Sequence, residues 1–196
     1  MRAGVLFSGG KDSTLAALLL DGFYDVTLVH AGFGVGDAAA HAEATADAIG
    51  FPFEQVRIDD DVADEVVDRM SEDGFPRNGI QTVHEAALAA VAADGYDAVA
   101  DGTRRDDRVP TVSRARAQTL EERHGIDYIS PLAGFGRGAV DRLVEETLEV
   151  EEAPADQLAK GDYEAELREL LREAGGDELA NEVFSDHVQT RVTGRR

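Results

Sequence analysis

The chain has 196 residues, of which 19 are lysine or arginine and 40 are aspartate or glutamate, so its formal charge is −21. Because 43% of the residues are hydrophobic, the chain can bury the core of one α/β domain, which excludes a disordered acidic tail. The absence of cysteine excludes disulfides, thiolate metal sites and a thiol nucleophile supplied by this chain.

Strands and helices alternate along the first 150 residues. An apolar strand over residues 2–7 leads through a glycine turn into a helix over 13–21. The alternation continues with strands over 25–30, 53–58, 97–101 and 127–130, and with helices over 38–49, 59–72, 79–93, 113–123 and 139–150. This pattern is typical of an α/β protein with a parallel sheet and right-handed crossovers.

The end of the chain has a different pattern. We expect a polar linker over residues 151–162, a helix over 163–174 and an irregular tail from residue 177. The leucines of that helix indicate a packing face or a dimer contact, so a homodimer is one expectation. The expected domains are therefore a sheet domain over residues 1–150 and a C-terminal helix and tail over 151–196.

Nearly all of the basic residues are arginines: 17 of the 19 are arginine, and only Lys11 and Lys160 are lysine. Such an acidic, lysine-poor composition is typical of a halophilic protein, since concentrated salt screens repulsion between surface charges. The same charge disfavours general nucleic-acid binding across the surface. The longest apolar run, residues 15–20, is too short to cross a membrane and no signal peptide is visible, so we expect a cytoplasmic protein with no membrane partner.

The first glycine turn has the composition of a phosphate-binding loop. Ser8-Gly9-Gly10-Lys11-Asp12-Ser13 joins the first strand to the first helix, where free N–H groups and the helix dipole favour an anion. Asp12 suits an anion site only if a divalent cation is also bound, which suggests a metal–polyphosphate ligand. A Walker A loop is excluded, because it would need glycine at Val5 and Ser or Thr at Asp12.

This Ser-Gly-Gly-Lys-Asp-Ser segment resembles the signature of the PP-loop, or N-type ATP pyrophosphatase, superfamily. The resemblance covers roughly residues 1–150. It implies a doubly wound, five-stranded parallel sheet of order 3-2-1-4-5, the adenine nucleotide α-hydrolase-like fold. It also implies that ATP and Mg²⁺ bind, that ATP is cleaved between the α and β phosphates, and that a substrate oxygen becomes an adenylate. Residues 8–13 would bind the nucleotide, with Lys11 and Asp12 also catalytic and Asp12 a metal ligand.

A second segment, Asp101 to Thr111, follows the fourth strand and has the glycine and paired acids that the superfamily often carries there. The resemblance implies that Gly102 and Thr103 contact the nucleotide. Asp106 or Asp107 would help to hold Mg²⁺ on the pyrophosphate, and Asp107 would take part in catalysis.

Arginines are concentrated in the same region. Five of the 19 basic residues fall between positions 104 and 116, in a chain whose net charge is −21. Arginine gives bidentate contacts to phosphates and carboxylates, so we expect Arg104 to act in catalysis and Arg105 and Arg108 to bind substrate. The alternative is an ordinary solvated helix start.

Two further segments are weaker signals. Phe75-Pro76-Arg77-Asn78-Gly79 has a short likeness to cyano-deazaguanine synthases, which implies that Arg77 and Asn78 bind substrate, although the cysteine zinc cluster of those enzymes is absent. A plain turn and helix entry is the alternative. His30 ends the second strand and would line an adenosine pocket or lie satisfied at its rim.

The leading hypothesis is an enzyme that adenylates a carboxyl or amide oxygen of a small-molecule or nucleobase substrate, which an external nitrogen nucleophile then attacks. Because the chain lacks cysteine, a sulfurtransferase acting on tRNA or a nucleobase would need an external sulfur donor. The rival from another class is a non-hydrolysing adenine-nucleotide-binding protein. The arginine segment and the tail, which contains three arginines, could contact RNA.

Overall fold

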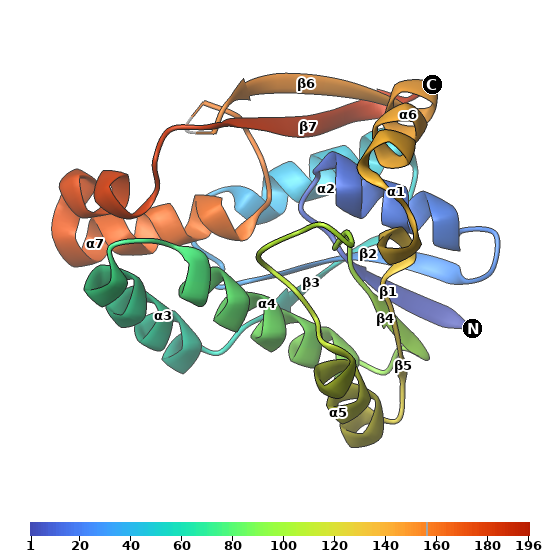
Figure 1. Ribbon diagram of the computed structural model, residues 1–196, viewed down its shortest axis with the longest axis horizontal. Helices are drawn as coiled ribbons and strands as arrows, with labels where there is room; N and C mark the ends of the chain where they lie inside the picture. The colour runs from blue at the N-terminus through green and yellow to red at the C-terminus, as the bar shows by residue number, and fades with distance from the viewer. Residues whose placement is uncertain (156) are drawn as a thin grey trace.

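The computed structural model describes residues 1–155 and 157–196. Five parallel strands form one sheet in the order β3-β2-β1-β4-β5, which confirms the predicted fold class (Figure 1). An antiparallel two-stranded sheet, β6-β7, lies beside it. The main-sheet elements are β1 (Arg2–Leu6), α1 (Lys11–Leu20), β2 (Asp25–Gly32), α2 (Ala38–Ile49), β3 (Phe53–Arg57), α3 (Asp60–Asp73), α4 (Arg77–Ala92), β4 (Ala98–Ala100), α5 (Arg114–His124) and β5 (Asp127–Ile129). They are followed by the 3₁₀ turn η1 (Pro131–Gly134), α6 (Arg137–Thr147), β6 (Leu148–Pro154), α7 (Tyr163–Val183) and β7 (Val188–Arg195).

The sheet is covered on both faces, because successive side chains of a strand point to opposite sides. Leu6 and Val29 pack with α3, α4 and α7 in one core cluster. Val5 and Leu28 pack with α1, α2, α6 and the hairpin β6-β7 in the other. The strand order reverses between β1 and β4, which is where α/β sheets of this kind bind ligands.

The C-terminal region differs from the sequence-based expectation. Residues 148–150, expected to end a helix, begin β6, and the linker expected over 151–162 continues that strand to Pro154. The tail expected to be irregular forms the second half of α7, after a kink at Gly176, and then β7. β6 and β7 pair across about 40 residues of chain, with Val150 opposite Val192, so neither strand has a local signal. The predicted C-terminal helix is confirmed and the irregular tail is wrong. The predicted linker is wrong up to Pro154, and the described residues between Pro154 and Tyr163 form neither helix nor strand.

Helix α7 packs into the main core. Leu167 and Leu171 are fully buried and belong to the same apolar cluster as the helices α3 and α4. The buried carboxylate of Glu166 accepts N–H groups of Phe33, Gly34 and Val35 at 2.9–3.1 Å, which ties α7 to the loop after β2. Leu167 and Leu171 therefore form a packing face, and the homodimer stays a prediction.

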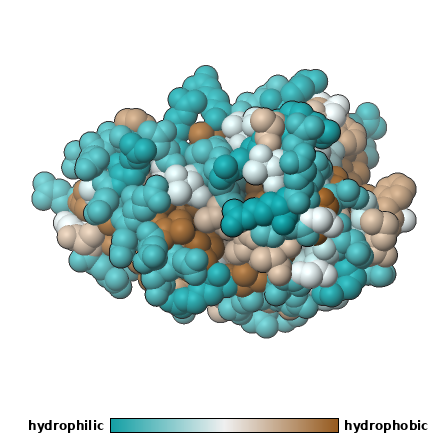
Figure 2. All heavy atoms as spheres, turned by 90° about the horizontal axis from the view of Figure 1, so that it is seen from below, coloured by the Kyte–Doolittle hydropathy of each residue, from teal (hydrophilic) through white to brown (hydrophobic). Residues whose placement is uncertain are grey.

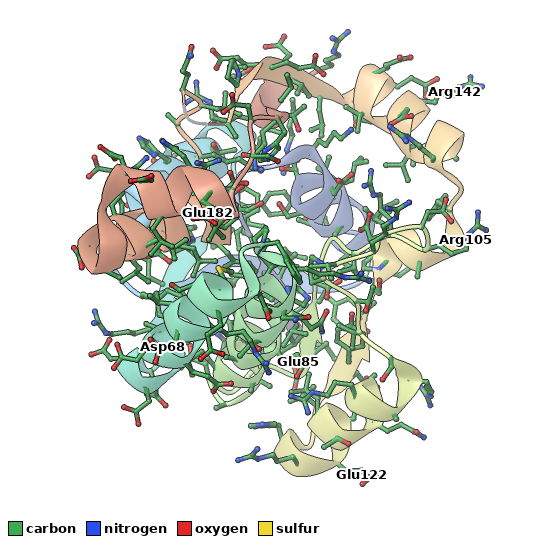
Figure 3. All side chains as sticks on the ribbon, turned by 60° about the vertical axis from the view of Figure 1, so that its left-hand side comes forward. Asp68, Glu85, Arg105, Glu122, Arg142 and Glu182 are labelled. Atoms are coloured by element: carbon green, nitrogen blue, oxygen red, sulfur yellow. The ribbon has the colours of Figure 1, made fainter. Side chains whose placement is uncertain are left out.

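The surface is strongly hydrophilic. Polar side chains cover most of the face shown in Figure 2, and hydrophobic atoms are visible between them. Charged side chains such as Asp68, Glu122 and Glu182 project outward from α3, α5 and α7 (Figure 3). None of the helices in the described part of the chain combines the length and apolar character needed to cross a bilayer.

Candidate nucleotide-binding site

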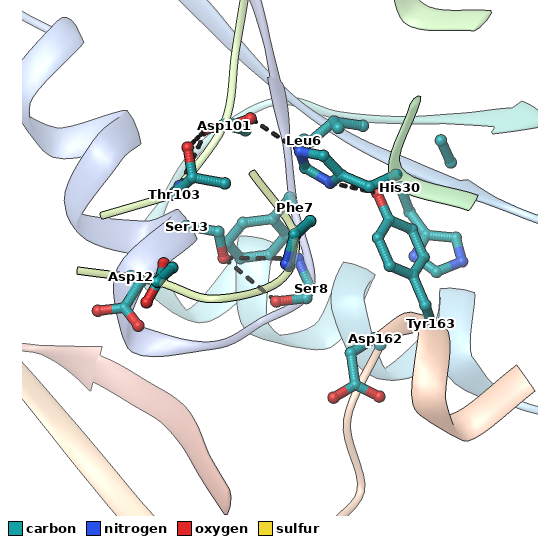
Figure 4. A pocket seen from close by; sticks show the side chains of 16 residues that line it. Leu6, Phe7, Ser8, Asp12, Ser13, His30, Asp101, Thr103, Asp162 and Tyr163 are labelled. Carbon is teal, nitrogen blue, oxygen red and sulfur yellow. Dashed lines mark hydrogen bonds and ion pairs between the residues drawn. The ribbon is translucent and has the colours of Figure 1, made fainter. Parts of the chain in front are cut away.

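A pocket of about 230 Å³ lies at the carboxyl ends of β1, β2 and β4, where the strand order reverses. Its walls come from the loop after β1, the end of β2, α4, the segment after β4 and the start of α7 (Figure 4). The lining residues are Leu6, Phe7, Ser8, Asp12, Ser13, His30, Ala31, His84, Asp101, Gly102, Thr103, Asp107, Pro110, Gly161, Asp162 and Tyr163.

The loop at residues 8–10 turns its carbonyl groups into the protein. The carbonyl oxygen of Ser8 accepts the Gly161 N–H at 3.1 Å, and that of Gly9 accepts the Val192 N–H at 2.9 Å. The carbonyl oxygen of Gly10 accepts the Thr14 N–H and the hydroxyl groups of Ser13 and Thr14, at 2.9–3.1 Å. Gly9 has a φ of +73°, which a side chain would strain.

The start of α1 is therefore free to bind an anion. Gly10 precedes its first residue and provides no side-chain cap. The first N–H groups of any α-helix have no intrahelical acceptor, and the positive end of the dipole lies there. Lys11 Nζ is half-buried and lies 3.9 Å from Asp141 of α6, outside the pocket wall itself.

Asp12, Arg104 and Asp107 form a charged cluster beside this helix start. Arg104 donates two hydrogen bonds to Asp107 Oδ1, at 2.8 and 3.0 Å, and lies 3.6 Å from Asp12. Burial raises the pKa of Asp12, although the charges of Arg104 and Lys11 oppose the shift. Asp12 Oδ1 is buried and has no hydrogen-bond partner among the described residues.

These carboxylates fit a hard divalent cation that also binds phosphate. The described residues contain no group of three or more acidic, histidine or cysteine side chains arranged to hold a metal ion by themselves. Mg²⁺ is commonly held by one or two carboxylates together with substrate phosphates, and Asp12 and Asp107 supply that number. Asp106, the other predicted metal ligand, is exposed and pairs with Arg105 outside the pocket.

Gly102 brings the segment after β4 against α1. A Cβ atom added at Gly102 would lie 2.6 Å from the backbone nitrogen of Ser13, so a side chain would force the two segments apart. The next residue, Thr103, donates its N–H and hydroxyl to Asp101 Oδ1 at 2.9 and 2.6 Å. Both predicted nucleotide contacts, Gly102 and Thr103, lie in the pocket wall.

A buried polar network at the pocket was not predicted. Asp101 Oδ2 accepts the Tyr128 hydroxyl and contacts His84 Nε2, both at 2.9 Å, and the Tyr163 hydroxyl lies 3.4 Å from His84 Nδ1. Burial opposes ionisation of Asp101, but hydrogen bonds from His84 and Thr103 outweigh it and lower the pKa of this carboxyl. Burial raises the pKa of the Tyr163 hydroxyl, which stays protonated. An acid directly after an apolar strand was the available signal for Asp101; nothing local indicates Tyr163.

His30 lies in the pocket wall, as predicted. Burial lowers its pKa, although the charge of Glu166 opposes the shift, so the imidazole is neutral at neutral pH. Its Nε2 atom is buried and has no hydrogen-bond partner among the described residues. His30 and Asp12 thus each carry a polar atom without a described partner, and both residues line the pocket.

The other predicted substrate residues lie outside this pocket. A neighbouring groove of about 540 Å³ is lined by Phe75, Arg77, Asn78, Gln81, Glu85, Arg108, Val109, Thr111, Ser113 and Arg116. Arg77 and Arg108 have no carboxylate within ion-pair distance among the described residues, whereas Asn78 donates to Asp73. Of the three arginines predicted for catalysis or substrate binding, Arg104 lies beside the loop, Arg108 lines the adjacent groove and Arg105 is exposed.

The chain is similar over its whole length to a solved structure from Methanocaldococcus jannaschii, described as that of a predicted subunit of tRNA methyltransferase. The TM-score is 0.89 and the identity 40%, covering 100% of this chain and 98% of that chain. The uncharacterized protein MJ0690 of the same organism is 42% identical over 195 residues, or 99% of this chain and 96% of that protein. The U34-tRNA thiolase NcsA of Methanococcus maripaludis, solved with its 4Fe–4S cluster, has a TM-score of 0.48 and 19% identity, covering 74% of this chain and 56% of that chain. The family described as a family of unknown function, DUF7411, matches residues 1–194, and the chain belongs to this family.

Proposed function

We propose that this protein binds Mg-ATP in the pocket and cleaves it between the α and β phosphates to adenylate an acceptor oxygen. The observation that carries the proposal is the loop at residues 8–10. The carbonyl groups of Ser8 and Gly9 are bonded to Gly161 and Val192, and that of Gly10 is bonded within the first turn of α1. All three carbonyl groups are therefore engaged, which leaves the N–H groups of the helix start for an anion. Beside it lies Asp12, with a buried carboxylate oxygen that no described residue satisfies.

The residues divide by the part of the nucleotide they would bind. The N–H groups at the start of α1, with Lys11 and Arg104, would bind the β and γ phosphates and stabilise the charge of the leaving pyrophosphate. Asp12 and Asp107 would hold Mg²⁺, which would neutralise phosphate charge. The neutral imidazole of His30 and the apolar wall of Phe7 and Ala31 suit the uncharged adenosine.

Two bond exchanges make up the reaction. The acceptor oxygen forms a bond to the α phosphorus, and the bond from that phosphorus to the bridging oxygen breaks, so that pyrophosphate leaves. A nitrogen nucleophile from outside the chain then attacks the carbon that bears the adenylated oxygen. The carbon–oxygen bond breaks, AMP leaves with that oxygen, and the nitrogen loses a proton. The chain has no cysteine to supply sulfur itself.

The groove next to the pocket is where we place the acceptor. It opens on the other side of the segment after β4, because Pro110 lines the pocket and Val109 and Thr111 line the groove. The guanidinium groups of Arg77 and Arg108, which have no described carboxylate partner, would bind its phosphate or carboxylate groups. The similar M. jannaschii protein is described as a predicted tRNA methyltransferase subunit, which supports an RNA nucleobase as the acceptor.

The likeness to a predicted subunit also favours a second candidate. A chain that serves as a subunit of a larger RNA-modifying complex could bind ATP without hydrolysing it, or deliver an adenylated nucleobase to an external sulfur donor. The products distinguish the three cases. Pyrophosphate release with an aminated product identifies the ligase-type enzyme, and pyrophosphate release with a thiolated product identifies the sulfurtransferase. Binding without turnover identifies the non-catalytic subunit.

The first test is calorimetric binding of Mg-ATP to wild type and to Lys11→Ala. We expect Lys11→Ala to bind ATP at least about tenfold more weakly, because it removes a charge from the phosphate site. Arg142→Ala is the matched control, since Arg142 is an exposed cation of α6 that pairs only with Glu146 among the described residues. Equal affinity of wild type and Lys11→Ala would contradict the proposed phosphate site.

The second test follows the reaction by phosphorus NMR, in high salt, with a tRNA fraction as the acceptor and ammonium as the nucleophile. AMP and pyrophosphate are the expected products. ADP and orthophosphate as first products would refute cleavage at the α phosphorus.

A further inference from the structure

The only two lysines of the chain lie beside the same turn of backbone. Lys11 is the first residue of α1, and Lys160 approaches Gly10 from the C-terminal region. A Cβ atom added at Gly10 would lie 3.5 Å from Lys160 Cε and 3.8 Å from Lys160 Nζ. The other 17 basic residues are arginines, five of which lie between positions 104 and 116.

The backbone around Lys160 is held firmly against the loop. The neighbouring Gly161 donates its N–H to the Ser8 carbonyl group, and Val192 of β7 donates to that of Gly9. Gly161 has no space for a side chain, because a Cβ atom there would lie 2.6 Å from the Ala38 carbonyl oxygen and from Ala42 Cβ. In Figure 1 the hairpin β6-β7 lies beside α1 and α2. The tertiary structure therefore brings Lys160 to a loop from which it is distant in the chain.

The Lys160 ammonium group is largely buried but its partners are few. It pairs with Asp162 Oδ2 at 2.8 Å and donates to Gln189 Oε1 at 3.3 Å, with 14% of its side chain exposed. Asp162 itself lines the pocket. Lys11, the first residue of α1, also has a carboxylate nearby, because its Nζ atom lies 3.9 Å from Asp141 Oδ1. Each lysine is thus held near the start of α1 by one carboxylate.

The choice of lysine agrees with this position. An arginine presents a rigid planar fork, whereas the lysine ammonium is a compact charge on a flexible stem with donors that rotate. A lysine can therefore turn from a neighbouring carboxylate to a phosphate oxygen without loss of hydrogen bonds. A purely structural ion pair would not need a lysine, since the described ion pairs elsewhere in the chain use arginine, histidine or the amino terminus.

We infer that Lys160 is a second polyphosphate ligand, so that the terminal phosphates of the nucleotide bind between the loop at residues 8–13 and the C-terminal segment. The inference rests on the proposed function, because it places Lys160 at the same ATP. It predicts that Lys160 recognises the pyrophosphate part of the ligand and contributes nothing to adenosine.

Binding of separate ligand parts tests this role. We expect Lys160→Met to bind pyrophosphate and ATP about tenfold more weakly, as for loss of a charge-assisted contact, and to bind adenosine as wild type does. Lys160→Arg should retain part of the pyrophosphate affinity, and Lys11→Met is the positive control. Unchanged pyrophosphate affinity of Lys160→Met would overturn the inference. An equal loss for adenosine would also overturn it, because it would assign Lys160 to positioning Asp162 and α7.

Wild-type protein gives a second measurement that does not depend on a variant. Labelling with lysine enriched in ¹³C at the ε carbon gives two signals from the chain, one for each lysine. Pyrophosphate should shift both signals and adenosine neither. A shift of the Lys11 signal alone would overturn the inference and leave the proposed function intact. If neither ATP nor pyrophosphate binds wild type, both the proposed function and the inference are wrong.

Discussion

Asp12 is a carboxylate in a largely buried position, with cations nearby and one oxygen unsatisfied by the described residues. Its neighbours include Arg104 and Lys11, yet burial has the larger effect and the pKa of the carboxyl is raised. A buried carboxylate with a raised pKa lowers the stability of the fold, and such groups are concentrated at functional sites. We regard Asp12 as a functional residue for that reason.

Asp12→Asn should raise the melting temperature at neutral pH. The folded-state pKa of Asp12 lies above its unfolded value, so stability falls as the pH rises from the unfolded value through the folded one, and the full cost of ionisation is present above the folded pKa. The difference between variant and wild type should shrink as the pH falls through that pKa and vanish below about pH 4, the ordinary range for aspartate. Thermal unfolding across this pH range measures it.

The same variant should lose the magnesium dependence of ATP binding. Asp106→Asn is the control for both effects, because Asp106 is an exposed neighbour in the same acidic segment. A lower melting temperature of Asp12→Asn at neutral pH would show that its ion pair with Arg104 stabilises the fold more than burial destabilises it.

Gly102→Ala should push the segment after β4 away from the start of α1. The added methyl group would lie 2.6 Å from Ser13 N and 2.7 Å from the Asp12 carbonyl carbon, and neither backbone atom can move independently of α1. We expect ATP affinity to fall by about tenfold or more, since displacing the helix start weakens several phosphate contacts together. Calorimetry measures the affinity. Gly138→Ala in α6 is the control, because nothing lies within 4 Å of its added methyl group and alanine favours helix.

At the scale of elements, α7 joins the end of β2 to the pocket. Glu166 binds three consecutive N–H groups after β2, while Tyr163, at the start of the same helix, reaches His84 at the pocket. The first turn of α7 thus connects the loop after β2 with the pocket through polar contacts. This connection explains why a helix far from the loop at residues 8–13 in sequence supplies part of the pocket wall.

Glu166→Gln should destabilise the protein by about 1–3 kcal/mol, because an amide has one acceptor oxygen where the carboxylate has two, and a buried N–H is left unsatisfied. Unfolding in denaturant, followed by circular dichroism, gives the free energy. The matched control is Glu169→Gln on the same helix, which is half-exposed and pairs with Arg172. A stability change of Glu166→Gln no larger than that of the control would argue against the role of the three N–H contacts.

At the scale of the whole molecule, the net charge of −21 produces repulsion between the acidic side chains of the surface. Exposed acids such as Asp68 and Glu122 lie on the outer faces of the helices (Figure 3). Cations collect near the pocket at the carboxyl ends of β1, β2 and β4 and near its neighbouring groove, where Arg104, Arg108 and the two lysines lie. A polyphosphate would therefore meet positive charge at this edge of an otherwise repelling surface.

The melting temperature should rise steadily with potassium chloride. Raising salt from about 0.1 M to 1 M shortens the Debye length from about 10 to 3 Å, which screens repulsion between surface acids. Differential scanning calorimetry over this range measures the effect, with sucrose as a neutral control. A melting temperature that stays constant or falls would show that the charge of this chain does not limit its stability.

The sequence by itself predicted the features that depend on neighbouring residues. Apolar runs followed by amphipathic helices indicated the parallel sheet, and the order β3-β2-β1-β4-β5 confirmed the fold that the loop sequence implied. Gly9 and Gly10 indicated the tight turn before α1, since that turn needs a positive φ at Gly9; phosphate binding by this loop stays a prediction. The sequence predicted that Gly102 and Asp107 lie near the loop, because they follow the strand β4, which adjoins β1. Both residues line the pocket.

Only the tertiary structure decided the features that join distant parts of the chain. The hairpin β6-β7, the contact of Lys160 with the loop, and the network of Asp101, His84 and Tyr163 each unite residues far apart in sequence. Local propensity carries no information on such pairings, because each is stabilised by burial and hydrogen bonds that exist only after the sheet has formed. The loop at residues 8–13 could therefore be located from the sequence, whereas the groups that surround it required the folded chain.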